Sequence, residues 1–151
     1  MKLNSKDYLL VGIQTILFIL YYFNFGILKL SFPQFVKNTA LIFAVFGGLI
    51  SVIAILQLNK NLSPFPTPKS GAQLIQTGLF KFVRHPIYSG ILIGLGGFAI
   101  YTSSGFRVII CLLLYVLFSV KTEYEEKLLI QKFEEYKKYQ KKTGKFLPKG
   151  F

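Results

Sequence analysis

The only histidine in the sequence, His85, lies among residues that could bind a charged ligand. It occurs in the run "GLFKFVRHPIYSG", where Arg84 precedes it and Tyr88 follows at the entry to an apolar segment. A second polar cluster, "EYEE", contributes Glu125 and Glu126 just after a later apolar segment. Because polar groups beside apolar segments are costly to desolvate, both clusters indicate a binding or catalytic purpose.

The chemistry of these groups fits a ligand that carries charges of both signs. Arginine and histidine can donate hydrogen bonds to a carboxylate, and carboxylates can accept them from ribose hydroxyls or an ammonium group. S-adenosylmethionine combines those features with a sulfonium. No glycine-rich turn follows a strand as in soluble nucleotide folds, and the "GLGG" run lies inside an apolar segment, where helix packing explains it better. One cysteine, Cys111, and one histidine cannot build a metal site.

Each residue of the two clusters also has a purely structural explanation. Pro86 suits the first turn of a helix, and Tyr88 suits an aromatic belt at a membrane surface. Glu125 and Glu126 could pair with neighbouring lysines on a solvated helix face. The joint presence of both charge signs at one membrane edge is what favours a ligand site.

The composition indicates the environment of the site. The 151 residues are 52% hydrophobic and 17% aromatic, whereas only 16% are charged, compared with roughly 25% in soluble domains. The chain is therefore predicted to be an all-α integral membrane protein with a single domain over residues 1–151. The net charge of +12 resides mainly in loops and in the tail, which indicates contact with anionic lipid and cytosol rather than with nucleic acid.

The elements that must position the clusters are apolar helices. A bilayer core requires about 20 apolar residues in a helix, and the apolar runs predict about four transmembrane helices, over residues 8–28, 39–58, 87–102 and 108–120. The "TSSG" run between the last two predicts a helical hairpin, which would bring residues 84–88 and 125–126 to the same edge. Small residues in the second and third helices predict close helix contact: Gly47, Gly48, Gly90, Gly94 and Gly97.

Two segments outside the apolar runs complete the prediction. The loop over residues 59–86 contains three prolines within "SPFPTPK", which favour extended structure, and its length favours a functional role. The tail over residues 121–142 is predicted to continue the last helix as a cytosolic amphipathic helix, with Glu123–Lys127 and Glu134–Lys138 as i,i+4 pairs. Its apolar stripe would lie against the loop or the bilayer: Leu129, Phe133, Tyr136 and Tyr139 or Gln140.

The distribution of basic residues predicts the orientation. Lysines before the first helix, basic residues in the 59–86 loop and the lysine-rich tail outnumber those at the opposite ends. Positive charge favours the cytosolic side. We therefore expect a multi-pass protein of the cell or inner membrane, with both termini and the candidate site facing the cytosol.

The order of the motifs resembles a known family. The pattern "P…P…L-I-x-x-G-x-F-x-x-x-R-H-P-I-Y-x-G", followed after a hairpin by "E-E-x-x-L…F…Y-x-x-Y…T-x-K-F-x-P", resembles the isoprenylcysteine carboxyl methyltransferase family. The wider group includes membrane phospholipid methyltransferases. The resemblance extends over residues 62–148, whereas the first two helices match only in kind.

The resemblance implies a polytopic membrane enzyme that binds S-adenosylmethionine between the loop and the C-terminal helix. The cofactor would enter from the cytosol and a lipid or prenylated substrate from the bilayer. Lys121 stands where eukaryotic carboxyl methyltransferases of the family have an arginine that holds the substrate carboxylate. The implied cofactor contacts are Ala72, Gln73, Leu74, Ile75, Arg84, His85, Pro86, Ile87, Tyr88, Glu125 and Glu126.

The sequence also departs from the family pattern. Lys121 replaces a bidentate guanidinium by a point charge, Phe80 stands where a tyrosine is frequent, and Lys145 replaces the arginine of the final motif. "KFEEY" lacks the glycine usually found between its phenylalanine and glutamate.

The predicted function is S-adenosylmethionine-dependent carboxyl O-methylation of a lipophilic acceptor. Phospholipid N-methylation is the alternative within the class, and a non-catalytic membrane binding protein or a sterol-type reductase are alternatives outside it. A carboxylate acceptor needs no general base, whereas an amine must lose a proton. The acceptor and the oligomeric state stay open.

Overall fold

The computed structural model describes residues 2–23 and 25–149, and within these residues it is all-helical with no strand. The helices are α1 (Ser5–Phe23), α2 (Gln34–Leu58), α3 (Pro86–Tyr101), α4 (Gly105–Lys132) and α5 (Tyr136–Lys142). Two short 3₁₀ helices, η1 (Asn59–Asn61) and η2 (Gly78–Lys81), lie in the loop between α2 and α3. The predicted all-α class is confirmed.

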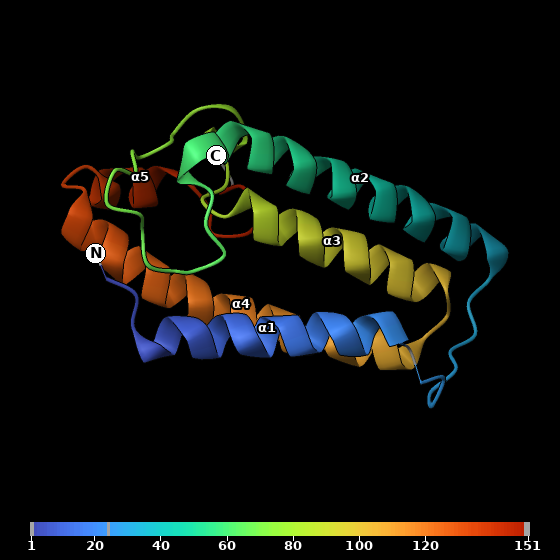
Figure 1. Ribbon diagram of the computed structural model, residues 1–151. Coiled ribbons are helices and arrows are strands. Elements are labelled where there is room, and N and C mark those ends of the chain that lie inside the picture. Colours follow the sequence, from blue (N-terminus) through green and yellow to red (C-terminus); the bar gives the residue numbers. More distant parts are fainter. Residues whose placement is uncertain (1, 24, 150–151) are drawn as a thin grey trace.

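The four long helices, α1 to α4, run side by side (Figure 1). The loop, α5 and the N-terminus of α1 lie at one end of the bundle, and the short α3–α4 connection lies at the other. Helix α2 packs on α3, and α4 packs on both α3 and α1. Helices that neighbour each other in sequence are therefore mostly neighbours in space.

Three helices are long and apolar enough to cross a membrane among the described residues: α1, α2 with its η1 extension, and α4. Many of their large apolar side chains face outwards, including Tyr22 at 79% and Leu56 at 72% exposure, as expected of helices solvated by lipid. The fourth predicted crossing, α3, has only 16 residues, a rise of about 24 Å. With 28 residues, α4 extends about 42 Å and exceeds a core of about 30 Å.

The first helix starts and ends earlier than the predicted range of 8–28. Asn4 and Asp7 form a reciprocal cap: the Asn4 side chain accepts the Lys6 N–H at 3.0 Å, and the Asp7 carboxylate accepts the Asn4 N–H at 2.8 Å. This arrangement has the geometry of a capping box and fixes the start of α1 at Ser5. The prediction was wrong here because it followed hydrophobicity and disregarded capping.

The predicted tail helix over residues 121–142 is wrong as a continuous element. Helix α4 does run on through Lys121 and ends at Lys132, but Phe133 has an extended backbone and the chain turns before α5. The Glu123–Lys127 pair forms at 3.2 Å, whereas no Glu134–Lys138 ion pair occurs in the described chain. The chain turns here instead of continuing as a helix, and the turn allows the tail to contact the loop, as described below.

The predicted small-residue contact between the second and third helices is present. A Cβ added at Gly90 would lie 2.6 Å from the Gly47 carbonyl oxygen, and one added at Gly97 would lie 2.5 Å from the Ala40 carbonyl oxygen. Both distances are far below van der Waals contact, so α2 and α3 touch backbone to backbone. The contact fixes the start of α3, and therefore His85, against α2.

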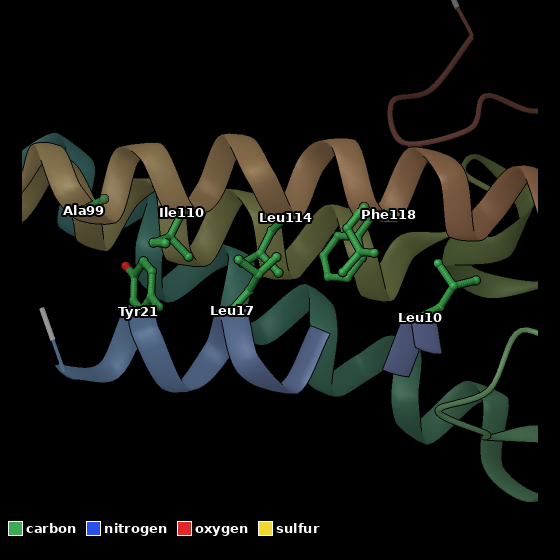
Figure 2. Packing of buried hydrophobic residues seen from close by; sticks show 8 residues of the cluster. Leu10, Leu17, Tyr21, Ala99, Ile110, Leu114 and Phe118 are labelled. Carbon is green, nitrogen blue, oxygen red and sulfur yellow. The ribbon is translucent and has the colours of Figure 1, made fainter. Parts of the chain in front are cut away.

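The apolar core joins α1 to α4 (Figure 2). Leu10, Leu17 and Tyr21 on α1 face Leu114 and Phe118 on α4, and all five are buried. The Tyr21 hydroxyl donates to the Leu95 carbonyl oxygen of α3 at 2.7 Å. This core sets the depth of α1 along α4, which matters because α1 also contributes polar residues to the site.

Candidate functional site

The two polar clusters predicted to converge do meet at one end of the bundle. Arg84 Nε lies 2.7 Å from Glu126 Oε1, and His85 Nε2 lies 3.0 Å from the same oxygen. His85 Nδ1 lies 3.9 Å from Glu125 Oε2. Arg84 and Glu126 side chains are only 8% and 9% exposed. The start of α3 and the middle of α4 therefore share one buried ionic network.

The tail returns to this network and completes it. Gln140 of α5 donates to Glu126 Oε2 at 2.7 Å, and the Arg84 guanidinium donates to the carbonyl oxygens of Gln140 and Thr143. The Arg84 and His85 N–H groups donate to the carbonyl oxygens of Gly144 and Lys145, at 2.9 and 3.2 Å. Every oxygen of Glu126 thus has a partner, which is the condition for a stable buried carboxylate.

The apolar stripe predicted in the tail lies against the loop. The Tyr139 hydroxyl donates to the Phe80 carbonyl oxygen at 2.6 Å, and burial raises the pKa of Tyr139 to about 12. Tyr139 therefore stays a donor at physiological pH. Tyr136 is 1% exposed, so the turn after Phe133 directs both tyrosines inwards.

A cavity between the loop and the tail contains most of the predicted cofactor contacts. It is lined by Ala72, Gln73, Leu74, Ile75, Arg84, His85 and Glu125, together with the stripe residues Leu129, Phe133, Tyr136 and Tyr139. We call it the loop cavity. In the described chain, Leu74 and Ile75 make no backbone hydrogen bond to protein, so their N–H and C=O groups are available to a ligand.

A second cavity adjoins the first and reaches in between the helices. We call it the helix cavity, and it is lined by residues of all four long helices and of the loop, including Gln14, Ile55, Pro86, Ile87, Tyr88 and Lys121. Leu58, Ser63, Phe80, Arg84, His85 and Glu125 border both cavities. Of the predicted site residues, Glu126 alone borders neither, and its partners are Arg84, His85 and Gln140.

Lys121 is fully buried, at 0% exposure, although it carries an ammonium group. Its Nζ donates to Gln14 Oε1 of α1 at 2.5 Å and lies 5.5 Å from the centre of the Tyr88 ring. Tyr88 itself stacks on Phe118 at 4.5 Å between ring centres. The helix cavity therefore has mainly apolar walls, and besides the polar residues that it shares with the loop cavity it contains the Lys121 ammonium.

Two residues of α1 contribute to the site although sequence reasoning did not identify them. Asp7 is fully buried, and its carboxylate accepts the N–H and the hydroxyl of Thr67 in the loop, at 3.1 and 2.8 Å. Gln14 lies two helical turns further on and reaches Lys121. The available signal was polar residues in an apolar helix, which face protein or a cavity more often than lipid.

The comparisons with known proteins agree with this geometry. The sequence model of the isoprenylcysteine carboxyl methyltransferase family matches residues 40–131. A probable protein-S-isoprenylcysteine O-methyltransferase of Oryza sativa subsp. indica is 30% identical over 128 residues, which cover 79% of this chain and 67% of the relative. The chain belongs to the isoprenylcysteine carboxyl methyltransferase family.

Two further similarities concern a second relative and the fold. The protein-S-isoprenylcysteine O-methyltransferase of Schizosaccharomyces pombe is 28% identical over 131 residues, which cover 79% of this chain and 56% of the relative. The solved structure of a eukaryotic intramembrane Ras methyltransferase, an isoprenylcysteine carboxyl methyltransferase, matches with a TM-score of 0.70 at 22% identity. It covers 99% of this chain, which spans 55% of that structure. The predicted family and the predicted enzyme class, a methyltransferase, are confirmed.

The structure shows the surroundings of two residues that depart from the family pattern, Phe80 and Lys145. Phe80, in place of a frequent tyrosine, is buried and borders both cavities. Lys145 donates to the Ser119 carbonyl oxygen at 3.1 Å, which ties the final motif to α4.

Proposed function

We propose that the protein is a multi-pass membrane methyltransferase that transfers a methyl group from S-adenosylmethionine to the carboxylate of an S-prenylated cysteine. The site would face the cytosol, with α3 as a fourth membrane crossing. The cofactor would occupy the loop cavity and the acceptor the helix cavity. The observation that carries the proposal is that the two cavities share the wall formed by Arg84, His85 and Glu125.

The residues of the loop cavity fit S-adenosylmethionine by their chemistry. Glu125 supplies a carboxylate for hydroxyl or ammonium groups, and His85 supplies a ring nitrogen. The backbone of Leu74 and Ile75 supplies groups free of protein partners, and the aromatic stripe supplies an apolar surface for a purine. When bound, the cofactor would supply a methyl group on a sulfonium sulfur, from which a neutral thioether departs readily as the methyl group is transferred.

The protein's own residues align the acceptor and exclude water. Glu126 fixes Arg84 and His85 through buried hydrogen bonds at 2.7 and 3.0 Å, which holds the shared wall in one geometry. Lys121 offers an ammonium to an anionic acceptor in the helix cavity. A carboxylate is deprotonated at neutral pH, so the residues need only position it, and positioning alone can supply a large part of a rate enhancement.

The test is methyl transfer by the purified protein in lipid, with methyl-labelled S-adenosylmethionine and an S-farnesylated N-acetylcysteine. We expect label in the acceptor that is released by mild base, as for an ester. Base-stable label in phosphatidylethanolamine would instead support phospholipid N-methylation. Absence of both cofactor binding and transfer would exclude the proposed enzyme.

A further inference from the structure

The most unusual polar contact in the membrane part of the molecule joins α1 to α4. Lys121 has three N–H donors, and among the described residues Gln14 is its one hydrogen-bond acceptor, at 2.5 Å. The remaining donors have the helix cavity beside them, because Lys121 and Gln14 both line it. A fully buried ammonium with a single neutral acceptor is incompletely satisfied, since buried charges are normally paired and hydrogen-bonded.

The orientation of the Gln14 side chain follows from this contact. Lys121 can only donate, so the carbonyl oxygen of the amide must face it. The amide NH₂ group of Gln14 has no protein partner in the described chain. The pair therefore presents spare N–H donors from two helices to one cavity. Among residues 2–23 and 25–149, no acceptor other than the Gln14 oxygen lies at hydrogen-bond distance from them.

The chemistry of Gln14 suits an anionic ligand in a way that a carboxylate would not. A neutral carbonyl oxygen stabilises the orientation of the Lys121 ammonium without cancelling its charge. A glutamate at this position would form an ion pair and remove the net positive charge from the cavity. Glu125, one helical turn after Lys121, also borders the cavity, but its oxygen lies 3.9 Å from His85 on the shared wall.

We propose that Gln14 is a specificity-determining residue of the acceptor site, which holds the Lys121 ammonium towards an acceptor carboxylate and donates its own amide to the same group. The inference rests on the proposed function, because it assigns the acceptor to the helix cavity. Gln14 lies in α1, outside residues 40–131 matched by the family model. The lysine, which lacks the planar fork of arginine, thereby gains a second donor from another helix.

The experiment compares acceptor affinity in the full-length protein and in Gln14→Met, Gln14→Glu and Lys121→Met. Displacement of a fluorescent prenyl probe by an S-farnesylated N-acetylcysteine and by its uncharged carboxamide measures the preference for the carboxylate without requiring turnover. Gln14→Met should weaken carboxylate binding about tenfold, as for loss of a hydrogen bond to a charged group. Gln14→Glu should weaken it more, and neither should change carboxamide binding by more than about twofold.

A double-mutant cycle separates positioning from general packing. If Gln14 acts together with Lys121, Gln14→Met should have little further effect on carboxylate binding in the Lys121→Met background. Thr15→Val is the matched control, because Thr15 is the neighbouring polar residue of α1 and is exposed on the outer face. Its variant should bind both acceptors as the parent protein does.

Two failures are distinguishable. Equal losses for carboxylate and carboxamide in Gln14→Met, or additive effects with Lys121→Met, would overturn the role of Gln14 while methyl transfer by the parent protein left the proposed function standing. Failure of the parent protein to transfer methyl groups or bind the acceptor would overturn the proposed function, and the role of Gln14 with it.

Discussion

Glu125 and Glu126 are adjacent carboxylates of α4 with different surroundings. Glu126 is buried and bonded to Arg84, His85 and Gln140, whereas the Glu125 side chain is 27% exposed and borders both cavities. Successive residues of a helix point about 100° apart, so one position faces the ionic network and the next faces the ligand space. Glu126→Gln should therefore affect mainly stability, whereas Glu125→Gln should affect mainly cofactor binding.

Glu126→Gln should lower stability more than Glu125→Gln. Loss of the charge leaves the buried Arg84 guanidinium without its counter-ion, and breaking a buried pair costs on the order of 3 kcal/mol. Thermal unfolding in detergent without ligand measures the effect, with Glu123→Gln as the exposed control. An unchanged Tm for Glu126→Gln would show that the network is not what holds the tail to α3.

Glu125→Gln should leave the Tm unchanged but weaken cofactor binding. A carboxylate that accepts hydrogen bonds from a ligand contributes about 1.5–3 kcal/mol, so the Kd should rise roughly tenfold or more. Titration calorimetry with S-adenosylmethionine measures the change. Wild-type affinity in this variant would place the cofactor away from Glu125.

At the scale of the elements, the site depends on helices that place loop and tail at one end of the bundle. The backbone contact of α2 with α3 fixes His85, and the Asp7 contact with Thr67 ties the start of α1 to the proline-rich loop. Each contact depends on a small or polar residue inside an apolar helix. Substitutions at these contacts therefore test how the helices and the loop are held together, without changing the residues that line the shared wall.

Gly90→Ala should destabilise the α2–α3 pair. The added methyl group would collide with the Gly47 carbonyl oxygen and the Ser51 side chain, and overpacking typically costs about 1–3 kcal/mol. Gly96→Ala is the matched control in the same helix, because apart from the adjacent backbone of α3 nothing in the described chain lies within 4 Å of the added group. Thermal unfolding should separate the two variants, and equal Tm values would contradict the packing described.

Asp7→Ala should free the loop from α1. The variant removes the acceptor of the Thr67 N–H and hydroxyl, leaving buried donors unsatisfied at a cost of about 1–3 kcal/mol each. Limited proteolysis within residues 62–77 should become faster, and cofactor affinity should fall. Thr15→Val, on the outer face of the same helix, should change neither; unchanged proteolysis in Asp7→Ala would refute the role of Asp7 in holding the loop.

At the scale of the whole molecule, the two ends of the helix bundle differ, and this difference predicts how the protein is oriented in the membrane. Both cavities lie at the end that contains the loop, α5 and the start of α1 (Figure 1), and α5 itself is rich in lysine. The opposite end contains the α1–α2 and α3–α4 connections. Basic residues favour the cytosolic side of a membrane.

The proposed orientation, with the site on the cytosolic side, predicts which positions a membrane-impermeant thiol reagent reaches. In a Cys111→Ser background, Ser70→Cys in the loop should react only when the cytosolic side is accessible. Ser31→Cys, at the other end of the bundle, should react only from the opposite side. Both serines are exposed, so access depends on the membrane alone, and the reverse pattern would overturn the cytosolic placement of the site.

The sequence by itself determined the membrane character, the all-α class, the family and the three residues of the shared wall, Arg84, His85 and Glu125. These follow from local composition and from the order of short motifs: an apolar run predicts a helix wherever it packs, and "RHPIY" with "EYEE" predicts a shared site across one hairpin. The apolar stripe of Leu129, Phe133, Tyr136 and Tyr139 was also visible in its spacing. Such features depend on neighbours along the chain.

Only the tertiary structure decided which residues support the site through contacts with distant parts of the chain. The turn after Phe133, the separation of Glu125 from Glu126, and the contributions of Asp7 and Gln14 depend on partners 14 to 107 positions away. Hydrogen bonds to such distant partners leave no periodic trace in the sequence, because a single polar side chain in an apolar helix is compatible with several neighbours. The packing of α1 on α4 selects Lys121 as the partner of Gln14.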